Sequence, residues 1–192
     1  MTLLLAAVVT STTCDSPAGP AHVALVQVTP GTWNPTALGD TVRFTAVAQT
    51  RLRTTIPGLP ITWSSDAPGV VFVGDDGSAV AHEGGVAQVR ATIDGVTGTA
   101  SVSVVQIIES VEILTYFGNT IPVLGDSLWL YVDARDRNHF SVPGTTFTLL
   151  SLHPSVAIIT LEGWVKGVSP GVADIVALAA GKADTAPVLV AP

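Results

Sequence analysis

The sequence of 192 residues contains a single cysteine, and charged residues make up only 12% of it. One cysteine cannot form an intramolecular disulfide, so packing and hydrogen bonds must stabilise the fold. The 8 lysines and arginines form no run and face 15 aspartates and glutamates, which gives a formal net charge of −7. A chain of this charge is poorly suited to bind nucleic acid or an anionic membrane surface, and we expect neither as a partner.

Residues that favour helices are also scarce. Glutamate, lysine and glutamine are few, and valine, threonine, alanine, glycine and proline dominate, which is typical of strands joined by turns. Hydrophobic residues make up 47% of the chain, so the chain can form a packed core and is not disordered. The length leaves room for one large domain or two small ones.

The N-terminal residues form a separate segment. Residues 3–9, LLLAAVV, are an apolar run too short to span a bilayer but suited to the core of a signal peptide. The following TSTTCDSPAGP resembles a lipobox and a tether, so we expect a signal peptide at 1–13, lipidation of Cys14 and a tether at 14–22. This predicts an exported protein, lipid-anchored to the bacterial cell envelope or outer surface. In the alternative, Cys14 is an incidental residue of a discarded leader.

The remaining sequence repeats itself at a shift of 86 residues. Leu38-Gly39-Asp40 recurs as Leu124-Gly125-Asp126, and the first strand alone is offset by 85, with Val26 matching Val111. We therefore expect two copies of one domain, at residues 23–106 and 107–192. The shift of 86 also relates Pro68 to Pro154, Val70 to Val156, Gly77 to Gly163, Gly85-Val86-Ala87 to Gly171-Val172-Ala173, Gly95 to Gly181, and Thr99-Ala100 to Thr185-Ala186.

Within each copy, apolar and polar residues alternate with a period of two, as in TVRFTAVA (41–48) and its counterpart SLWLYVDA. Seven such short strands in a copy predict an all-β fold of two tandem immunoglobulin-like sandwiches, with about seven antiparallel strands each. Trp63 is expected to face inward from a central strand, and Leu149 takes its place in the second copy. In the first copy the strands are expected near 23–29, 41–48, 59–64, 69–73, 78–81, 86–93 and 97–105.

A family resemblance supports this interpretation. The stretches ITWSSDAPGVVFV and GGVAQVRATIDGVTGTASVSV resemble a bacterial Ig-like domain of group 2, the module found in invasin- and intimin-type surface proteins. In the second copy EGWVKGVSPGVADIVA matches well, although the tryptophan is missing and Pro187 interrupts the last strand. The resemblance covers roughly residues 23–190 and implies the fold and an extracytoplasmic location. It implies no activity, because this fold carries many functions.

The segment between the copies, VSVVQIIESVEI at 102–113, contains no glycine or proline. A flexible linker would be rich in glycine and serine. We therefore expect a stiff pair arranged end to end.

Motifs for catalysis are not convincing. GVSPG at 167–171 matches the nucleophile elbow of serine hydrolases, but no helix is expected after Ser169. The residue that would complete the oxyanion hole is Pro170, which has no N–H. We interpret the motif as a hairpin turn and predict that the protein is not an enzyme.

Motifs for metal binding are equally weak. The histidines, at positions 22, 82, 139 and 153, fall at unrelated spacings, whereas zinc ligands normally cluster. DARDRNH at 133–139 and GDDG at 74–77 offer oxygen ligands for Ca²⁺, which some family members bind, but neither has EF-hand spacing. Acidic residues in turns are ordinary, so we predict no metal site and no cofactor.

The two copies differ most on their outward faces. On the second strand Arg43 and Thr45 point outward in the first copy, where Trp129 and Tyr131 point outward in the second. Exposed apolar patches mark contact sites, and these two aromatics suit a sugar or an aromatic hot spot. On the last two strands, polar residues of the first copy give way to the apolar Val176, Leu178 and Leu189, which suit a protein surface.

Two alternatives remain for these faces: the residues lie under a loop, or the strand phase slips by one. Trp164 is expected to fill the core after a tight turn, and Trp33, in a loop, is a weaker candidate for exposure.

These observations favour a non-catalytic binding or adhesion module of the cell envelope. In this interpretation the first domain is a stalk and the second contacts a protein or glycan. The alternative is a structural spacer or an assembly subunit, either of a larger envelope or phage-tail-like complex or through self-association of the second domain.

Overall fold

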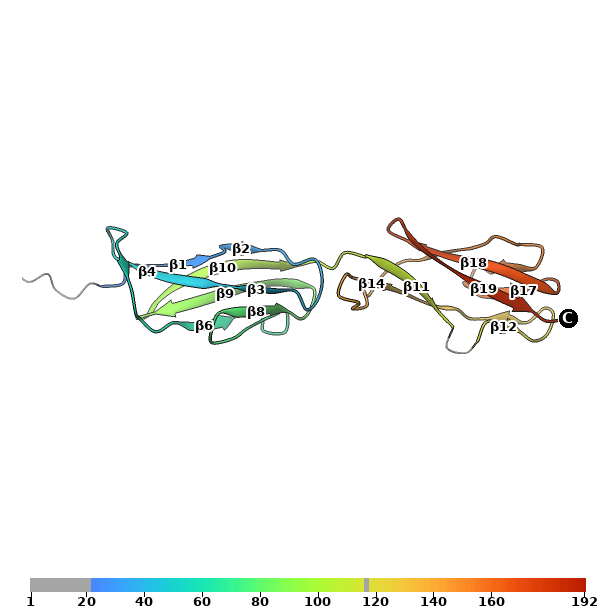
Figure 1. Ribbon diagram of the computed structural model, residues 1–192, viewed down its shortest axis with the longest axis horizontal. Helices are drawn as coiled ribbons and strands as arrows, with labels where there is room; N and C mark the ends of the chain where they lie inside the picture. Colours follow the sequence, from blue (N-terminus) through green and yellow to red (C-terminus); the bar gives the residue numbers. More distant parts are fainter. Residues whose placement is uncertain (1–21, 116–117) are drawn as a thin grey trace, which may run out of the picture.

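The alternating segments form strands throughout the residues that the computed structural model describes, 22–115 and 118–192 (Figure 1). The all-β fold class is confirmed. The expected signal peptide, Cys14 and residues 14–21 of the tether lie outside the described residues. In the part of the chain that is described, no helix is long and apolar enough to cross a membrane.

The strands up to residue 104 pair among themselves in two layers. One layer contains the sheets β1-β4-β5 and β3-β8-β7, and the other layer is the sheet β2-β10-β9-β6. This is the arrangement of an immunoglobulin-type sandwich. The bounds are β1 Leu25–Thr29, β2 Thr32–Trp33, β3 Thr41–Arg43, β4 Thr45–Gln49, β5 Thr55–Ile56, β6 Thr62–Ser65, β7 Val71–Val73, β8 Ser78–Ala81, β9 Gly85–Ile93 and β10 Val96–Val104.

The strands from residue 110 onward form a second sandwich with the same plan, except that β5 has as its counterpart only an isolated bridge between Arg135 and Ser141. Its layers are β11-β14 with β13-β17-β16, and β12-β19-β18-β15. The last two strands, β18 and β19, lie 86 residues after β9 and β10. The bounds are β11 Ser110–Leu114, β12 Thr120–Ile121, β13 Ser127–Leu128, β14 Tyr131–Arg135, β15 Thr148–Ser151, β16 Ala157–Ile159, β17 Val165–Gly167, β18 Gly171–Ala179 and β19 Lys182–Val190.

Three details differ from the sequence-based expectation. The sandwiches are not wholly antiparallel, because β2 runs parallel to β10 and β12 runs parallel to β19. In each case the chain moves from one layer to the other after its first strand without reversing direction. The expected strand 41–48 is broken at Phe44, where the backbone N–H bonds to the Gly77 carbonyl. The strand that carries Trp63, β6, is an edge strand and not a central one.

The core of the first sandwich lies between its layers. Phe44 is 1% exposed, and the rings of Trp33 and Trp63 each pack against it with centroids 6.3 Å away. Trp63 therefore faces inward as expected. The expected exposure of Trp33 is wrong, because this residue lies in β2 and packs on the core. The two-residue strand β2 is stabilised by its pairing with β10. Because β10 lies about 70 residues later in the chain, the local sequence around Trp33 does not reveal the strand.

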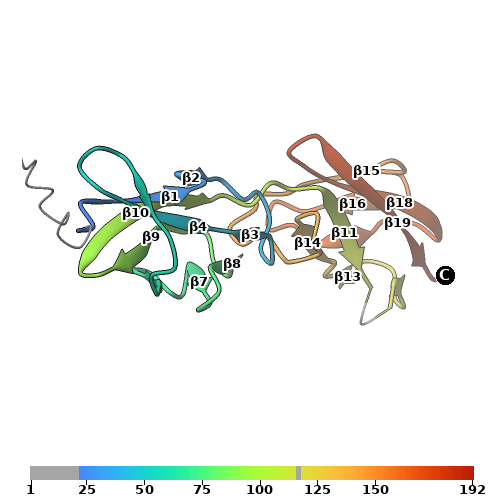
Figure 2. The ribbon, with the colours of Figure 1, turned by 60° about the vertical axis from the view of Figure 1, so that its left-hand side comes forward.

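The two sandwiches lie end to end (Figures 1 and 2). Residues 105–109 connect them without strand pairing, but the backbone N–H groups of Val105 and Ile107 bond to the carbonyls of Pro35 and Thr36. All strands within 22–192 have their pairing partners inside this range. The segment from residue 22 onward therefore contains a pairing partner for each of the described strands.

Candidate functional site

The clearest difference between the sandwiches lies at one pair of cross-strand positions. In the first sandwich Arg43 of β3 is the register partner of Ser78 of β8, and the guanidinium lies 3.1 Å from the carboxylate of Asp76. The positions 86 residues later are occupied by Trp129 and Trp164. Their ring centroids are 5.1 Å apart and their planes meet at 68°. The cross-strand pair Arg43 and Ser78 of the first sandwich is thus replaced by an exposed aromatic pair in the second.

This aromatic pair corrects one expectation. Trp164 was expected in the core, but it is 42% exposed and packs against Trp129 on the outer surface. The reason is its register, since position 164 corresponds to Ser78, whose side chain also faces outward to bond with Asp76. The turn before it forms as expected, with Gly163 at a φ of 87°.

An apolar groove of about 460 Å³ opens beside the aromatic pair. Its lining comes from residues 129–132 around the start of β14, residues 147–149 at the start of β15, and residues 159–163 at the end of β16 and in the turn to β17. The lining residues are Trp129, Leu130, Tyr131, Val132, Phe147, Leu149, Ile159, Thr160, Leu161 and Gly163.

The groove exists because the second sandwich lacks aromatic volume that the first contains. In the first sandwich the indole of Trp63 fills this place, packed on Phe44 and close to Gly77, where an added Cβ would lie 3.1 Å from the indole. The corresponding residues of the second sandwich are Leu149, Leu130 and Gly163. Two smaller side chains replace two aromatic rings, and the space between the layers stays open to the surface.

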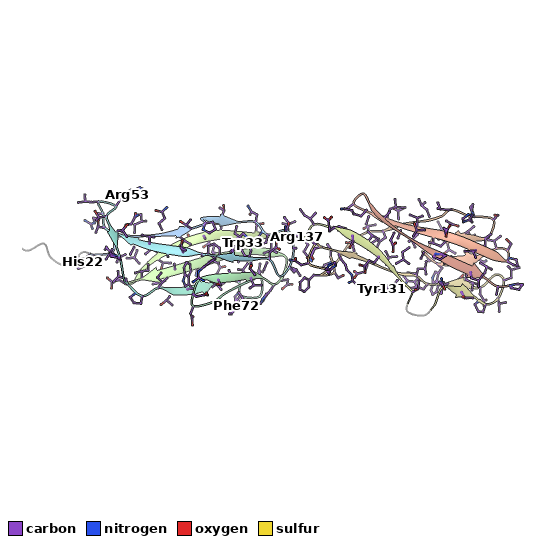
Figure 3. The ribbon with its side chains drawn as sticks, in the orientation of Figure 1. His22, Trp33, Arg53, Phe72, Tyr131 and Arg137 are labelled. Atoms are coloured by element: carbon purple, nitrogen blue, oxygen red, sulfur yellow. The ribbon has the colours of Figure 1, made fainter. Side chains whose placement is uncertain are left out.

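The predicted contact residues Trp129 and Tyr131 line this groove, with 50% and 55% of their side chains exposed. Figure 3 places Tyr131 on the second sandwich. Sequence reasoning identified these two residues but missed Phe147, Leu149 and Leu161, which lie on other strands and loops. The replacement of Trp63 by Leu149 was the available signal, because a smaller residue at a core position leaves a space.

The other predicted contact residues, Val176, Leu178 and Leu189, lie elsewhere. They face outward from the sheet β12-β19-β18-β15, where Val176 is the register partner of Leu150 and Leu189 that of Val172. Leu189 is 44% exposed, while Val176 and Leu178 are half-buried. The corresponding face of the first sandwich carries Ser103, Arg90, Thr92 and Ser64. The second sandwich thus has two apolar surfaces, the groove and this sheet face.

A polar cluster joins the sandwiches and involves a residue that sequence reasoning did not single out. Asp136 is 1% exposed and is the one charged side chain buried among the described residues. Its carboxylate accepts hydrogen bonds from Leu38 N and Gln106 Nε2, both at 2.9 Å, and from Asn138 N and Phe140 N at 2.9 and 3.1 Å. Two of these donors belong to the first sandwich and the connecting segment.

A second carboxylate, Asp40, completes this junction. It pairs with Arg137, which Figure 3 places between the two sandwiches, and it accepts a hydrogen bond from Asn138 Nδ2 at 2.9 Å. Burial by itself raises the pKa of Asp136, but the hydrogen bonds that it accepts outweigh burial and hold this pKa below its ordinary value of 3.8. Burial and the bonds from Arg137 and Asn138 act on Asp40 in the same way, and its pKa is also lowered.

The acidic stretches considered for Ca²⁺ have other partners. Asp136 holds the junction, and Asp76 bonds to Ser78 and Arg43. The described residues contain no group of three or more His, Cys, Asp or Glu side chains that could hold a metal ion.

The Ser169 hydroxyl donates to the Ser155 carbonyl at 2.7 Å. Its turn joins β17 of one layer to β18 of the other, so the expectation of a hairpin is wrong.

Comparisons with known proteins give fold neighbours only. No family model matches the chain, and no curated protein matches it. Among solved structures, domains 4 and 5 of the S-layer protein SbsC share 21% identity and a TM-score of 0.42, covering 90% of this chain and 100% of that one. The Yersinia pseudotuberculosis adhesin InvE shares 14% identity over 86% of this chain, with a TM-score of 0.43. The Escherichia coli adhesin FdeC shares 18% over 88%, with a TM-score of 0.42.

The chain spans 58% of the InvE structure and 64% of the FdeC structure. At these TM-scores the function has to be argued from the residues of this chain. The assignment to group 2 of the bacterial Ig-like domains stays a prediction.

Proposed function

We propose that this protein is a non-catalytic binding module of the bacterial cell surface, in which the second sandwich makes the contact and the first presents it. The observation that carries the proposal is the groove beside Trp129 and Tyr131. It is apolar and open, whereas the indole of Trp63 occupies the corresponding place in the first sandwich.

The shape and chemistry of the groove suit a protein side chain or a sugar ring. Ligand sites are concave and mostly apolar, with few polar groups that fix orientation. Here Thr160 and the Tyr131 hydroxyl are the polar groups of the lining, and Trp129 offers a partly exposed ring. Large aromatics at such positions dominate binding energies at interfaces.

The first test fills the groove with a larger side chain of the protein itself. Leu149→Trp restores the residue that the first sandwich carries at this position, so the fold tolerates an indole there while the groove loses its volume. Trp129→Ala combined with Tyr131→Ala removes the outer wall instead. The matched control is Arg43→Ala with Thr45→Ala, the same two positions in the first sandwich.

We expect both groove variants to lose capture of glycans or envelope and host-matrix components, while the control and the wild-type protein retain it. Melting temperatures of the wild-type and variant proteins monitor folding. Retention of the same components by folded Leu149→Trp protein would contradict the proposal.

Anchoring is the second element of the proposal. If Cys14 carries a lipid, Cys14→Ser moves the protein from the membrane fraction to the soluble exported fraction. Unchanged partitioning of this variant would remove the anchor from the proposal and leave the groove unaffected.

The apolar sheet face favours a second candidate function, that of an assembly subunit. Val176, Leu178 and Leu189 stand where the first sandwich carries Arg90, Thr92 and Ser103, so the face suits packing against another sheet. Leu178→Asp with Leu189→Asp should then dissolve side-by-side oligomers in sedimentation experiments. A wild-type protein that shows no such oligomers at high concentration would contradict this candidate.

A further inference from the structure

The junction between the sandwiches consists of a loop that docks into a turn. The loop of the second sandwich, Asp136–Phe140, is closed by Asp136 N bonding to the Phe140 carbonyl at 2.9 Å. The turn of the first sandwich, Ala37–Asp40, is closed by Asp40 N bonding to the Ala37 carbonyl. Arg137 of the loop pairs with Asp40 of the turn, and the Phe140 ring lies over Gly39.

Both parts of this junction occur a second time, at the two outer ends of the described pair of sandwiches. The loop Thr50–Thr54 of the first sandwich corresponds to Asp136–Phe140 and has the same backbone, with Thr50 N bonded to the Thr54 carbonyl at 2.9 Å. Arg53 has a φ of 60°, and its counterpart His139 has a φ of 65°. Figure 3 shows Arg53 at the same end as His22.

The turn recurs at the opposite end. Val123–Asp126 of the second sandwich corresponds to Ala37–Asp40, with Asp126 N bonded to the Val123 carbonyl at 3.1 Å. These residues follow β12, which lies beside the C-terminus in Figure 1. The space over Gly125 is open, whereas the space over Gly39 holds the Phe140 ring.

The side chains of the Thr50–Thr54 loop and of the Val123–Asp126 turn are complementary. Arg51 corresponds to Arg137, and Asp126 corresponds to Asp40. Arg51 and Asp126 are both exposed, and neither forms a salt bridge within the described residues. Leu52 is 89% exposed on the loop, and Val123 and Leu124 of the turn are 58% and 50% exposed. A loop with a cation and an apolar tip therefore matches a turn with an anion and apolar neighbours.

We infer that a second copy of this chain docks its Thr50–Thr54 loop on the Val123–Asp126 turn, so that copies join end to end with Arg51 paired to Asp126. This contact between two molecules has the same plan as the junction between the two sandwiches inside each molecule. Because it joins two different surfaces, it does not close on itself and continues as an open line. This inference does not rest on the groove. It applies to protein released from a lipid anchor, because the docking loop lies at the His22 end, which the proposed tether holds at the membrane.

The contact between copies is weaker than the internal one. Thr50 stands where the junction has Asp136, so the buried carboxylate with its four donors is missing. The internal junction also benefits from its short connecting segment, which holds the partners at an effective concentration of about millimolar. Association should therefore appear only as the protein concentration approaches that range.

The experiment combines sedimentation with small-angle X-ray scattering on the segment from residue 22 onward, over concentrations up to about 1 mM. End-to-end joining raises the mass and the maximum dimension while the cross-section stays that of a single rod. Arg51→Asp and Asp126→Arg should each weaken the association by about tenfold or more, because like charges then face each other. The double variant should restore it. Arg90→Asp makes the same charge change on the outward face of β9, away from both ends, and should have no effect on the association.

Four results would overturn the inference. One is a protein that stays monomeric over the whole range. Another is association that increases the cross-section and depends on Leu178 and Leu189, because this identifies side-by-side packing. The others are equal association of the wild-type and Arg51→Asp proteins, and single variants that the double variant does not rescue.

Discussion

Asp136→Ala is expected to loosen the junction and destabilise the second sandwich. The carboxylate accepts four hydrogen bonds in a site that is 1% exposed, and its removal leaves four N–H donors without their partner. Each buried donor without a partner costs about 1–3 kcal/mol, but water can reach donors once the junction opens. We therefore expect a total loss of about 2–4 kcal/mol, rather than the full sum.

The loss divides between two observable quantities. The bonds to Asn138 N and Phe140 N lie inside the second sandwich and close its loop, so their loss lowers its melting temperature. A loss of about 2 kcal/mol in a domain of this size corresponds to a shift of about 8 °C or more. The bonds to Leu38 N and Gln106 Nε2 cross the junction, so their loss widens the distribution of distances between the sandwiches.

Both quantities can be measured on the segment from residue 22 onward. This segment has no cysteine, so Ser101→Cys and Thr185→Cys provide one spin label on each sandwich for distance measurements. Asp136→Asn, which keeps the size and one acceptor oxygen, should cost about half as much as Asp136→Ala. An unchanged melting temperature together with an unchanged distance distribution in the alanine variant would refute the role of Asp136.

Three further predictions concern the junction carboxylates, the turns and the core. Because the pKa values of Asp136 and Asp40 are lowered below 3.8 in the folded protein, their contribution is present above pH 3.8 and is lost as the pH falls through the lowered values. Thermal melts from pH 5 to pH 2 should therefore show a steeper loss for wild-type protein than for Asp136→Asn; parallel curves would contradict this. Gly77→Ala places a Cβ 2.4 Å from the Phe44 carbonyl at a φ of 81°, so it should cost more than about 2 kcal/mol by denaturant unfolding. Gly163→Ala, whose nearest neighbour is Trp129 Cζ3 at 3.9 Å, should cost only the backbone strain of about 1 kcal/mol, and equal losses would refute the packing argument. Leu149→Trp should leave the melting temperature of the second sandwich unchanged or higher, and a drop of more than about 5 °C would show that the groove cannot take the indole.

The sequence predicted most of the features that follow from the alternation of apolar and polar residues along a strand. The outward direction of Trp129 and Tyr131 follows from alternation along one strand, and both side chains are exposed. The prediction that Trp164 fills the core is wrong, because Trp164 stands at the position of Ser78, whose side chain faces outward. Size favours burial only on average, whereas the strand phase fixes the face on which a side chain lies.

The features that sequence could not predict depend on contacts between distant residues. Asp136 bonds to Leu38 N across 98 positions, and nothing in the stretch DARDRNH distinguishes this aspartate from the exposed acidic residues of other turns. The two-residue strand β2 is likewise held only by its pairing with β10. The sequence indicated part of the groove, since Leu149 stands where the first copy has Trp63, but the lining comes from three separate segments of the chain.

Capture of surface components by wild-type and Leu149→Trp proteins side by side is the most direct test of the contact role of the second sandwich. We expect the tryptophan variant to lose the components that the wild-type protein binds, while the Arg43→Ala and Thr45→Ala control keeps them. Identical sets captured by the wild-type and the folded tryptophan variant would contradict it.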